Sequence, residues 1–150
     1  MLRMTHLAIG FAAAVYFLPL VNNELVFFLV VMATSLLPDA DSGTSRLGKK
    51  KIFRPLQMIS KHRGFFHTYT FAVLASLALA LVYPIVALPF FLGYSFHLLA
   101  DSFTPMGIRP FWPFKGKSTG IVKAGGPIDK AIFITFIIID IILAVTFLAR

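Results

Sequence analysis

Cysteine is absent from the 150 residues of the chain. Its absence excludes disulfide bonds, thiolate metal sites and cysteine nucleophiles. It also restricts metal binding, because an ion would have to be held by the nitrogen and oxygen atoms of other side chains. A metal site in this chain is therefore expected to consist of histidines and carboxylates.

Charged residues are scarce. They make up 13% of the chain, whereas soluble domains carry about 25%. Hydrophobic residues make up 58% and the mean hydropathy is +0.85, which is typical of an integral membrane protein. A chain of this length usually forms one domain. We therefore expect residues 1–150 to be a single membrane-embedded domain.

Five apolar segments reach, or nearly reach, the length needed to cross a hydrocarbon layer about 30 Å thick. Tyr83 and Pro84 are the only break between the third and fourth, and the sequence PLVNNE joins the first two, so each pair should form a tight helical hairpin. No small-residue cleavage pattern follows the first segment, which we expect to be retained. The sequence predicts an all-α integral membrane bundle of about five transmembrane helices, over residues 5–21, 25–37, 65–83, 85–100 and 131–149.

Basic residues are distributed unevenly along this map. Arg3 precedes the first segment, seven Lys and Arg residues lie at positions 46–63, and five lie at 109–130. Short cytoplasmic loops are enriched in Lys and Arg, so five spans would place these residues and the N-terminus in the cytoplasm, and Arg150 outside. This topology accounts for the net charge of +8. We therefore predict no nucleic-acid partner, and expect the basic loops to attract anionic lipid headgroups.

Seven ionisable residues lie where the first four segments begin or end. They include all four histidines and three of the six acidic residues, and five alternating spans would place all seven on the cytoplasmic side. Ionisable groups in membrane segments are unfavourable and tend to mark functional sites. We therefore predict a metal site built from most of these residues: His6, Asp39, Asp41, His62, His67, His97 and Asp101.

The local spacing of these residues suits metal binding. His97 and Asp101 are four residues apart, which places both side chains on one face of a helix. Asp39 and Asp41 follow Pro38, where an extended chain lets residues two apart face the same way. Imidazole with carboxylate favours zinc, or else manganese or iron, as one or two ions. The preferred metal ligands are Asp39, Asp41, His67, His97 and Asp101.

The candidate catalytic residues are His62, Arg63 and His6. His62 and His6 would be further ligands or proton donors to a leaving oxygen, although His6 alone could also anchor a helix at the headgroups. The guanidinium of Arg63 would bind phosphoryl oxygens, or Arg63 is an ordinary cytoplasmic basic residue. Each histidine or aspartate taken alone is more often structural than functional. Asp140 lies about 15 Å into the last segment, too deep to join this site.

Four motifs occur in order along the chain: TH near the N-terminus, LLPDADS, HRGFFHT and GYSFHLLADSFTPMGIRPFWPF. In this order they resemble, over residues 5–114, the YdjM-like family of inner-membrane proteins, some of them LexA-regulated, that are described as predicted metal-dependent hydrolases. Phe66 and Thr68 differ from the residues usual in that family, whereas the histidines agree. A weaker similarity to zinc-dependent phospholipase C follows the order of the His and Asp residues. The resemblance implies hydrolase activity.

Two classes of function fit these features. The first is a phospholipase-like, metal-dependent hydrolase that cleaves phosphoesters in lipid or lipid-linked substrates at the cytoplasmic leaflet of the cell inner membrane. The second is non-catalytic, either a structural membrane metalloprotein or a metal transporter. A transporter should hold its ligands near the bilayer midplane, whereas these residues lie at one rim. The sequence leaves the substrate, the metal and the oligomeric state open.

Overall fold

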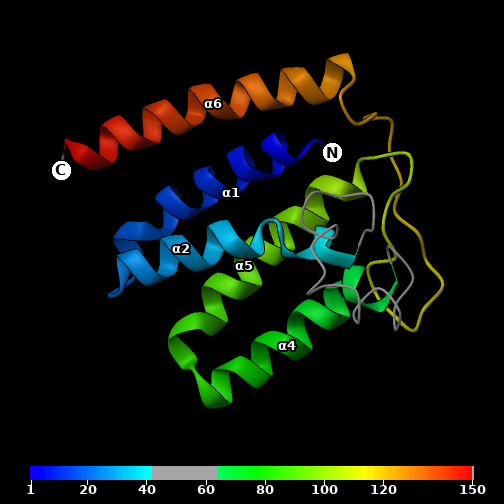
Figure 1. Cartoon of the computed structure of the whole chain (residues 1–150), viewed down its shortest axis with the longest axis horizontal. Coiled ribbons are helices and arrows are strands. Elements are labelled where there is room, and N and C mark those ends of the chain that lie inside the picture. Colours follow the sequence, from blue (N-terminus) through cyan, green and yellow to red (C-terminus); the bar gives the residue numbers. More distant parts are fainter. Residues whose placement is uncertain (42–63, 150) are drawn as a thin grey trace.

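The computed structural model describes residues 1–41 and 64–149, and these residues form a helical bundle (Figure 1). Within them there is no β-strand, and the extended pairing is confined to an isolated bridge between Ile108 and Ser118. The α-helices are α1 (Arg3–Phe17), α2 (Glu24–Thr34), α4 (Tyr69–Val82), α5 (Pro84–Ser102) and α6 (Pro127–Leu148), with 3₁₀ turns η1 (Leu18–Leu20), η2 (Leu37–Asp41) and η4 (Phe65–His67). The all-α prediction is confirmed.

The helices differ in length. Three stretches are long and apolar enough to cross a membrane: the 18 residues Arg3–Leu20, the 19 of α5 and the 22 of α6. By contrast, α2 has 11 residues and α4 has 14, or about 17 and 21 Å at 1.5 Å per residue. Both are shorter than a hydrocarbon layer of about 30 Å. The predicted segments 25–37 and 65–83 are therefore longer than the α-helices that they contain.

Local sequence explains these shorter helices. A proline disfavours α-helical conformation in the residue before it, so Pro38 opposes continuation of α2, and the chain turns into η2 instead. At the start of α4, the Thr68 hydroxyl accepts a hydrogen bond from the Phe71 backbone N–H at 3.0 Å and caps the helix. The chain before that cap forms η4. Two of these 3₁₀ turns carry predicted ligands: η2 carries Asp39 and Asp41, and η4 carries His67.

Helix α5 is central to the bundle. It packs against α1, α2 and α4, and α1 packs in turn against α2 and α6, so both predicted hairpins are present. Gly93 lies where α5 approaches α2: a Cβ atom there would lie 2.2 Å from Thr34 Oγ1 and 2.5 Å from the Val31 carbonyl oxygen. The absence of a side chain at Gly93 therefore allows the close approach that sets α5 beside the end of α2.

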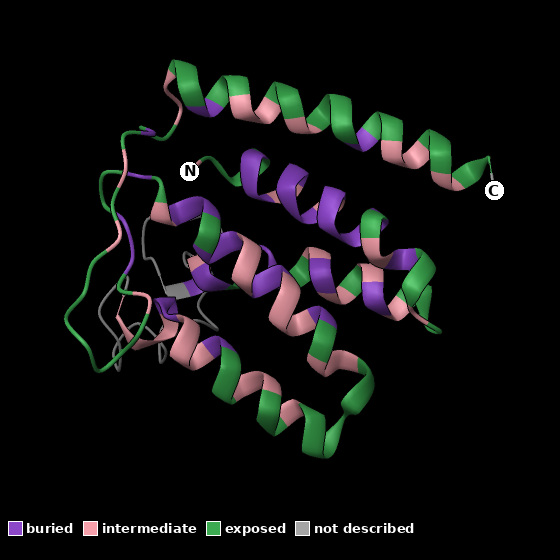
Figure 2. Cartoon of the chain, turned by 180° about the vertical axis from the view of Figure 1, so that it is seen from behind, coloured by how far each residue is buried: buried purple, intermediate pink, exposed green. Residues whose placement is uncertain are grey.

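The exposed faces of the bundle are strongly apolar. Figure 2 shows that most of α6 and the outer face of α4 are exposed, and in α6 only Asp129 and Asp140 are buried. In a membrane protein these faces contact lipid rather than water. The starts of α1, α4 and α6 and the ends of α2 and α5 all lie at the same end of the bundle (Figure 1). The predicted ligands of the described chain therefore gather at one end.

Candidate metal centre

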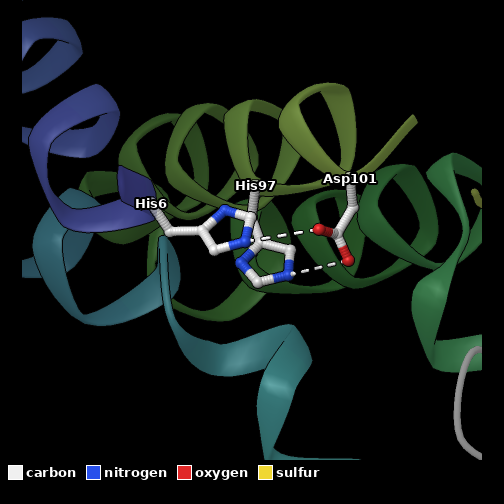
Figure 3. A group of neighbouring side chains, drawn as sticks. All are labelled: His6, His97 and Asp101. Atoms are coloured by element: carbon white, nitrogen blue, oxygen red, sulfur yellow. Dashed lines mark ion pairs between the residues drawn. The ribbon is translucent and has the colours of Figure 1, made fainter. Parts of the chain in front are cut away.

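Three buried side chains from two helices form the centre of the candidate site (Figure 3). His6 is the fourth residue of α1, in its first turn, and His97 and Asp101 lie near the end of α5. One potential ligand atom from each residue lies within 4.8 Å of the other two. The four-residue spacing that predicts a shared face for His97 and Asp101 is confirmed, since their Nε2 and Oδ2 atoms are 3.9 Å apart.

The Asp101 carboxylate lies between three imidazoles. Its Oδ1 atom is 3.3 Å from Nε2 of His6, and its Oδ2 atom is 3.4 Å from Nε2 of His67. The amine of Met1 also contacts Oδ1, at 2.7 Å. All these groups are almost completely removed from solvent, with side-chain exposures of 2% or less. A carboxylate buried this deeply needs positive or hydrogen-bonding partners, and these groups provide them.

The His97 ring has a defined tautomer. Its Nδ1 atom lies 2.7 Å from the carbonyl oxygen of Ser35, and because a carbonyl oxygen only accepts, Nδ1 carries the proton. The buried Nε2 atom has no hydrogen-bond partner among the described residues and lies 3.8 Å from Oδ1 of Asp39. An imidazole held through Nδ1 by a backbone carbonyl, with a free Nε2 lone pair, is the arrangement of a metal-ligating histidine.

The rings of the site are also packed against one another. The His6 and His97 rings stack with their centroids 3.9 Å apart and their planes 11° apart. The His67 ring meets the His97 ring edge-on, at 5.3 Å and 76°. Stacking and burial restrict the rotation of all three rings. The Nε2 atoms of His6 and His67 are therefore held near Asp101, and that of His97 lies between Asp101 and Asp39.

Asp39 is the most accessible of these residues, with 24% of its side chain exposed. Burial raises the pKa of its carboxyl above the ordinary value, and the nearby His6 acts in the opposite direction. The other members of the cluster are enclosed by the helices. Water would therefore reach the cluster most readily from the Asp39 side.

The distances within the cluster fit a metal site. Four ligands about 2.1 Å from a tetrahedral zinc ion lie about 3.4 Å from one another. The nitrogen–oxygen distances between the imidazoles and the carboxylates are 3.3, 3.4, 3.8 and 3.9 Å. Nitrogen and oxygen donors suit zinc, manganese or iron. The residues that would hold the ion are His6, His67, His97, Asp39 and Asp101.

The structure brings together five of the predicted site residues. His6, which the sequence gives as a ligand or proton donor, lies in the ligand group itself. The predicted residues His62 and Arg63, and the side chain of Asp41, lie outside the part of the chain that the structure describes. Their assigned roles stay predictions.

Asp129 supports the site in a way that its sequence context does not reveal. Its buried carboxylate accepts hydrogen bonds from the Leu2 N–H at 2.9 Å, the Thr5 hydroxyl at 2.7 Å and the Gly125 N–H at 2.7 Å. These bonds tie the start of α6 to the start of α1, next to His6. An acidic residue in the first turn of a helix ordinarily indicates only a favourable interaction with the helix dipole.

Asp140 lies apart from the cluster, as its depth in the last segment predicts. Its side chain is 8% exposed and lines an apolar groove of about 360 Å³ with α1 residues that include Met4 and Phe11. Its Oδ1 atom has no hydrogen-bond partner within the described chain. Asp140 therefore provides a buried carboxyl that is independent of the candidate metal centre.

Comparison with known proteins shows which proteins the chain is similar to. A family model described as "YdjM inner membrane protein" matches residues 1–149. Relatives named "Inner membrane protein YdjM" in Escherichia coli strain K12 and Shigella flexneri are each 42% identical over 89 residues, covering 53% of this chain and 45% of the relative. The chain thus spans less than half the length of these curated relatives. No solved structure matches the chain. The names give a membrane location and no activity.

Proposed function

The chain belongs to the YdjM inner membrane protein family, and from its site geometry we propose that it is a membrane-bound, metal-dependent hydrolase. Its substrates would be phosphoesters in lipid or lipid-linked molecules at the cytoplasmic leaflet. The observation that carries the proposal is the convergence of three imidazole Nε2 atoms on the carboxylates of Asp101 and Asp39. A catalytic zinc ion takes three protein ligands and keeps one position for water, so the five candidate donors would supply three ligands and two hydrogen-bonding partners.

The imidazoles and carboxylates of the cluster would bind the ion, and the Ser35 carbonyl orients the His97 ring. Packing of the His6 and His67 rings against His97 holds them beside Asp101. A divalent cation bound here would polarise a phosphoryl oxygen and lower the pKa of a bound water from about 15.7 toward about 7. Asp39, at the accessible side of the cluster, is placed to accept a hydrogen bond from an incoming water or hydroxyl group. These roles match phosphoester hydrolysis.

The location of the substrate follows from charge and depth. The cluster lies at one end of the bundle (Figure 1), on the side to which the basic residues assign the cytoplasm. Lys and Arg residues near that surface would attract anionic headgroups. Within this proposal His62 is a further ligand or proton donor, and Arg63 binds phosphoryl oxygens.

A structural metal site is the second candidate function. The observation that favours it is the burial of His6, His67, His97 and Asp101, each with a side-chain exposure of 2% or less. An ion whose coordination positions are all filled by protein ligands would join the ends of α1, α2, α4 and α5 and would catalyse no reaction. A metal transporter is less consistent with the structure, because transported ions bind near the midplane, whereas these residues lie at the ends of their helices.

Metal analysis and hydrolysis assays on one detergent-purified preparation separate the two functions. For the enzyme we expect one or two divalent ions per chain and hydrolysis of bis-p-nitrophenyl phosphate or of anionic phospholipid vesicles. Both should be lost in His97→Ala, which removes a buried nitrogen donor. Asp140→Asn, which changes a buried carboxyl outside the cluster, should retain both and serves as the control. Stoichiometric metal without hydrolysis of any phosphoester would establish the structural function, and absence of metal would contradict both.

A further inference from the structure

A long apolar groove lies between α1, α5 and α6. It arises because α6 packs chiefly against α1, and α5 packs against another side of α1. The groove has a volume of about 520 Å³ and an apolar lining that includes Met1, Leu99, Ala100, Ile132, Ile139 and Leu143. This volume is in the range of ligand-binding pockets, about 300–1,000 Å³.

One end of the groove adjoins the candidate metal centre. Met1 and Ala100 line the groove, the Met1 amine lies 2.7 Å from Asp101 Oδ1, and Ala100 directly precedes Asp101 in α5. From this end the groove follows α6, where its lining residues recur as one stripe from Ile132 to Leu143. That distance is about 17 Å. The groove therefore begins beside the polar cluster, from which Met1 separates it, and extends into the part of the bundle that the membrane surrounds.

We propose that this groove holds one acyl chain of a lipid substrate, whose polar head lies at the metal centre. The assignment rests on the proposed function for the reaction at the lipid head. Binding of the acyl chain does not depend on that reaction. The groove would select lipids with a long hydrocarbon chain. It would also place the phosphoester bond of the lipid at a fixed depth, next to Asp101.

The position and lining of the groove favour a lipid as its occupant. A lipid has a polar head and a hydrocarbon chain, and the groove offers an apolar lining that begins beside a polar cluster and extends along α6 for about 17 Å. A single flexible hydrocarbon chain matches both the length and the apolar lining. Selectivity for long acyl chains would come from close packing in the groove. Exclusion from water would contribute little, because an acyl chain outside the groove lies in the bilayer and is already away from water.

Adjacent isoleucines on α6 provide a matched test. Ile139 lines the groove and Ile138 does not, although both belong to the exposed apolar residues of the helix. Ile139→Trp should fill the groove, and Ile138→Trp should add the same bulk to the lipid-facing surface. On α5, Leu99→Trp and Leu88→Trp form a second pair, because Leu99 lines the groove and Leu88 does not. The second pair keeps the test decisive if one variant fails to fold.

The first readout is lipid binding, measured by native mass spectrometry of the whole chain with dioleoyl-phosphatidylglycerol. We expect one retained lipid per chain, and affinity about tenfold weaker in Ile139→Trp and Leu99→Trp, since overpacking is unfavourable. Ile138→Trp and Leu88→Trp should bind like the unaltered protein. The same affinity in all four variants would overturn the proposal. So would a protein that retains no lipid.

The second readout separates this proposal from the proposed function. With dioleoyl- and dihexanoyl-phosphatidylglycerol as substrates, Ile139→Trp and Leu99→Trp should raise KM more for the long-chain lipid than for the short-chain lipid, and Ile138→Trp and Leu88→Trp should leave both KM values unchanged. If no phosphoester is hydrolysed but lipid binding still distinguishes Ile139→Trp from Ile138→Trp, the groove assignment stands and the hydrolase proposal fails. If hydrolysis occurs with the same chain-length dependence in all variants, the hydrolase proposal stands and the groove assignment fails.

Discussion

At the scale of single residues, backbone atoms orient the site as much as side chains do. His97 is held by the carbonyl oxygen of Ser35, whereas the Ser35 hydroxyl donates to the Met32 carbonyl oxygen at 2.9 Å. The serine side chain therefore plays no direct part in orienting the imidazole. Any residue at position 35 that keeps the backbone conformation would leave the carbonyl in place.

Ser35→Ala should therefore retain the metal. The substitution removes one hydrogen bond, so we expect the free energy of unfolding to fall by about 0.5–1.5 kcal/mol. Metal affinity, measured by competition with a chromogenic chelator, should match that of the unaltered protein. Loss of the ion from Ser35→Ala as complete as that from His97→Ala would show that the hydroxyl, and not the carbonyl, organises this side of the site.

At the scale of elements, the approach of α2 and α5 brings the Ser35 carbonyl to His97. Gly93 allows this approach, and the atoms that a Cβ there would meet include a backbone carbonyl, which cannot rotate away. The geometry of the site thus depends on a residue that touches none of its ligands.

Gly93→Ala should separate α2 from α5. Although alanine favours helix formation by about 1 kcal/mol over glycine, the overlap with Val31 and Thr34 should make the net effect unfavourable by about 1–3 kcal/mol. Gly116→Ala is the matched control, because a Cβ there meets no atom within 4 Å. Denaturant unfolding in one detergent compares the two. Equal stability of Gly93→Ala and Gly116→Ala would show that the helices are not closely packed at Gly93.

Sequence alone predicts which residues meet at one end of the bundle better than it predicts the bounds of the helices or the contacts between them. His6 begins one apolar segment, whereas His97 and Asp101 end another. Because successive segments alternate in direction, the start of the first and the end of the fourth share one end of the bundle. The lengths of α2 and α4 are less predictable, since apolar residues continue through the 3₁₀ turns. The hydrogen bonds of Asp129 cannot be predicted from the sequence, because its partners Leu2 and Thr5 lie more than a hundred residues away. No local sequence pattern indicates that pairing.

At the scale of the whole molecule, the account requires both the candidate site and the basic loops to face the cytoplasm. Lys115 is exposed in the loop after α5, and Asn22 is exposed in the turn between η1 and α2. That loop and that turn lie at opposite ends of the bundle (Figure 1). The proposed topology would place these two residues on different sides of the membrane.

Because the chain contains no cysteine, single cysteines report this topology without background. In intact spheroplasts, a membrane-impermeant maleimide should label Asn22→Cys and not Lys115→Cys. After the membrane is permeabilised, both should be labelled. Labelling of Lys115→Cys in intact spheroplasts, with Asn22→Cys protected, would reverse the orientation and place the site outside the cytoplasm.

If the helix ends surround a cation with imidazole and carboxylate, X-ray absorption spectroscopy of the zinc-loaded protein should detect those ligands, because imidazoles produce multiple-scattering features that other ligands lack. We expect a nitrogen and oxygen shell at about 2.0–2.1 Å with at least two imidazoles, and fewer imidazoles in His6→Ala. Failure to bind zinc, or a shell without imidazole, would contradict the proposed metal centre.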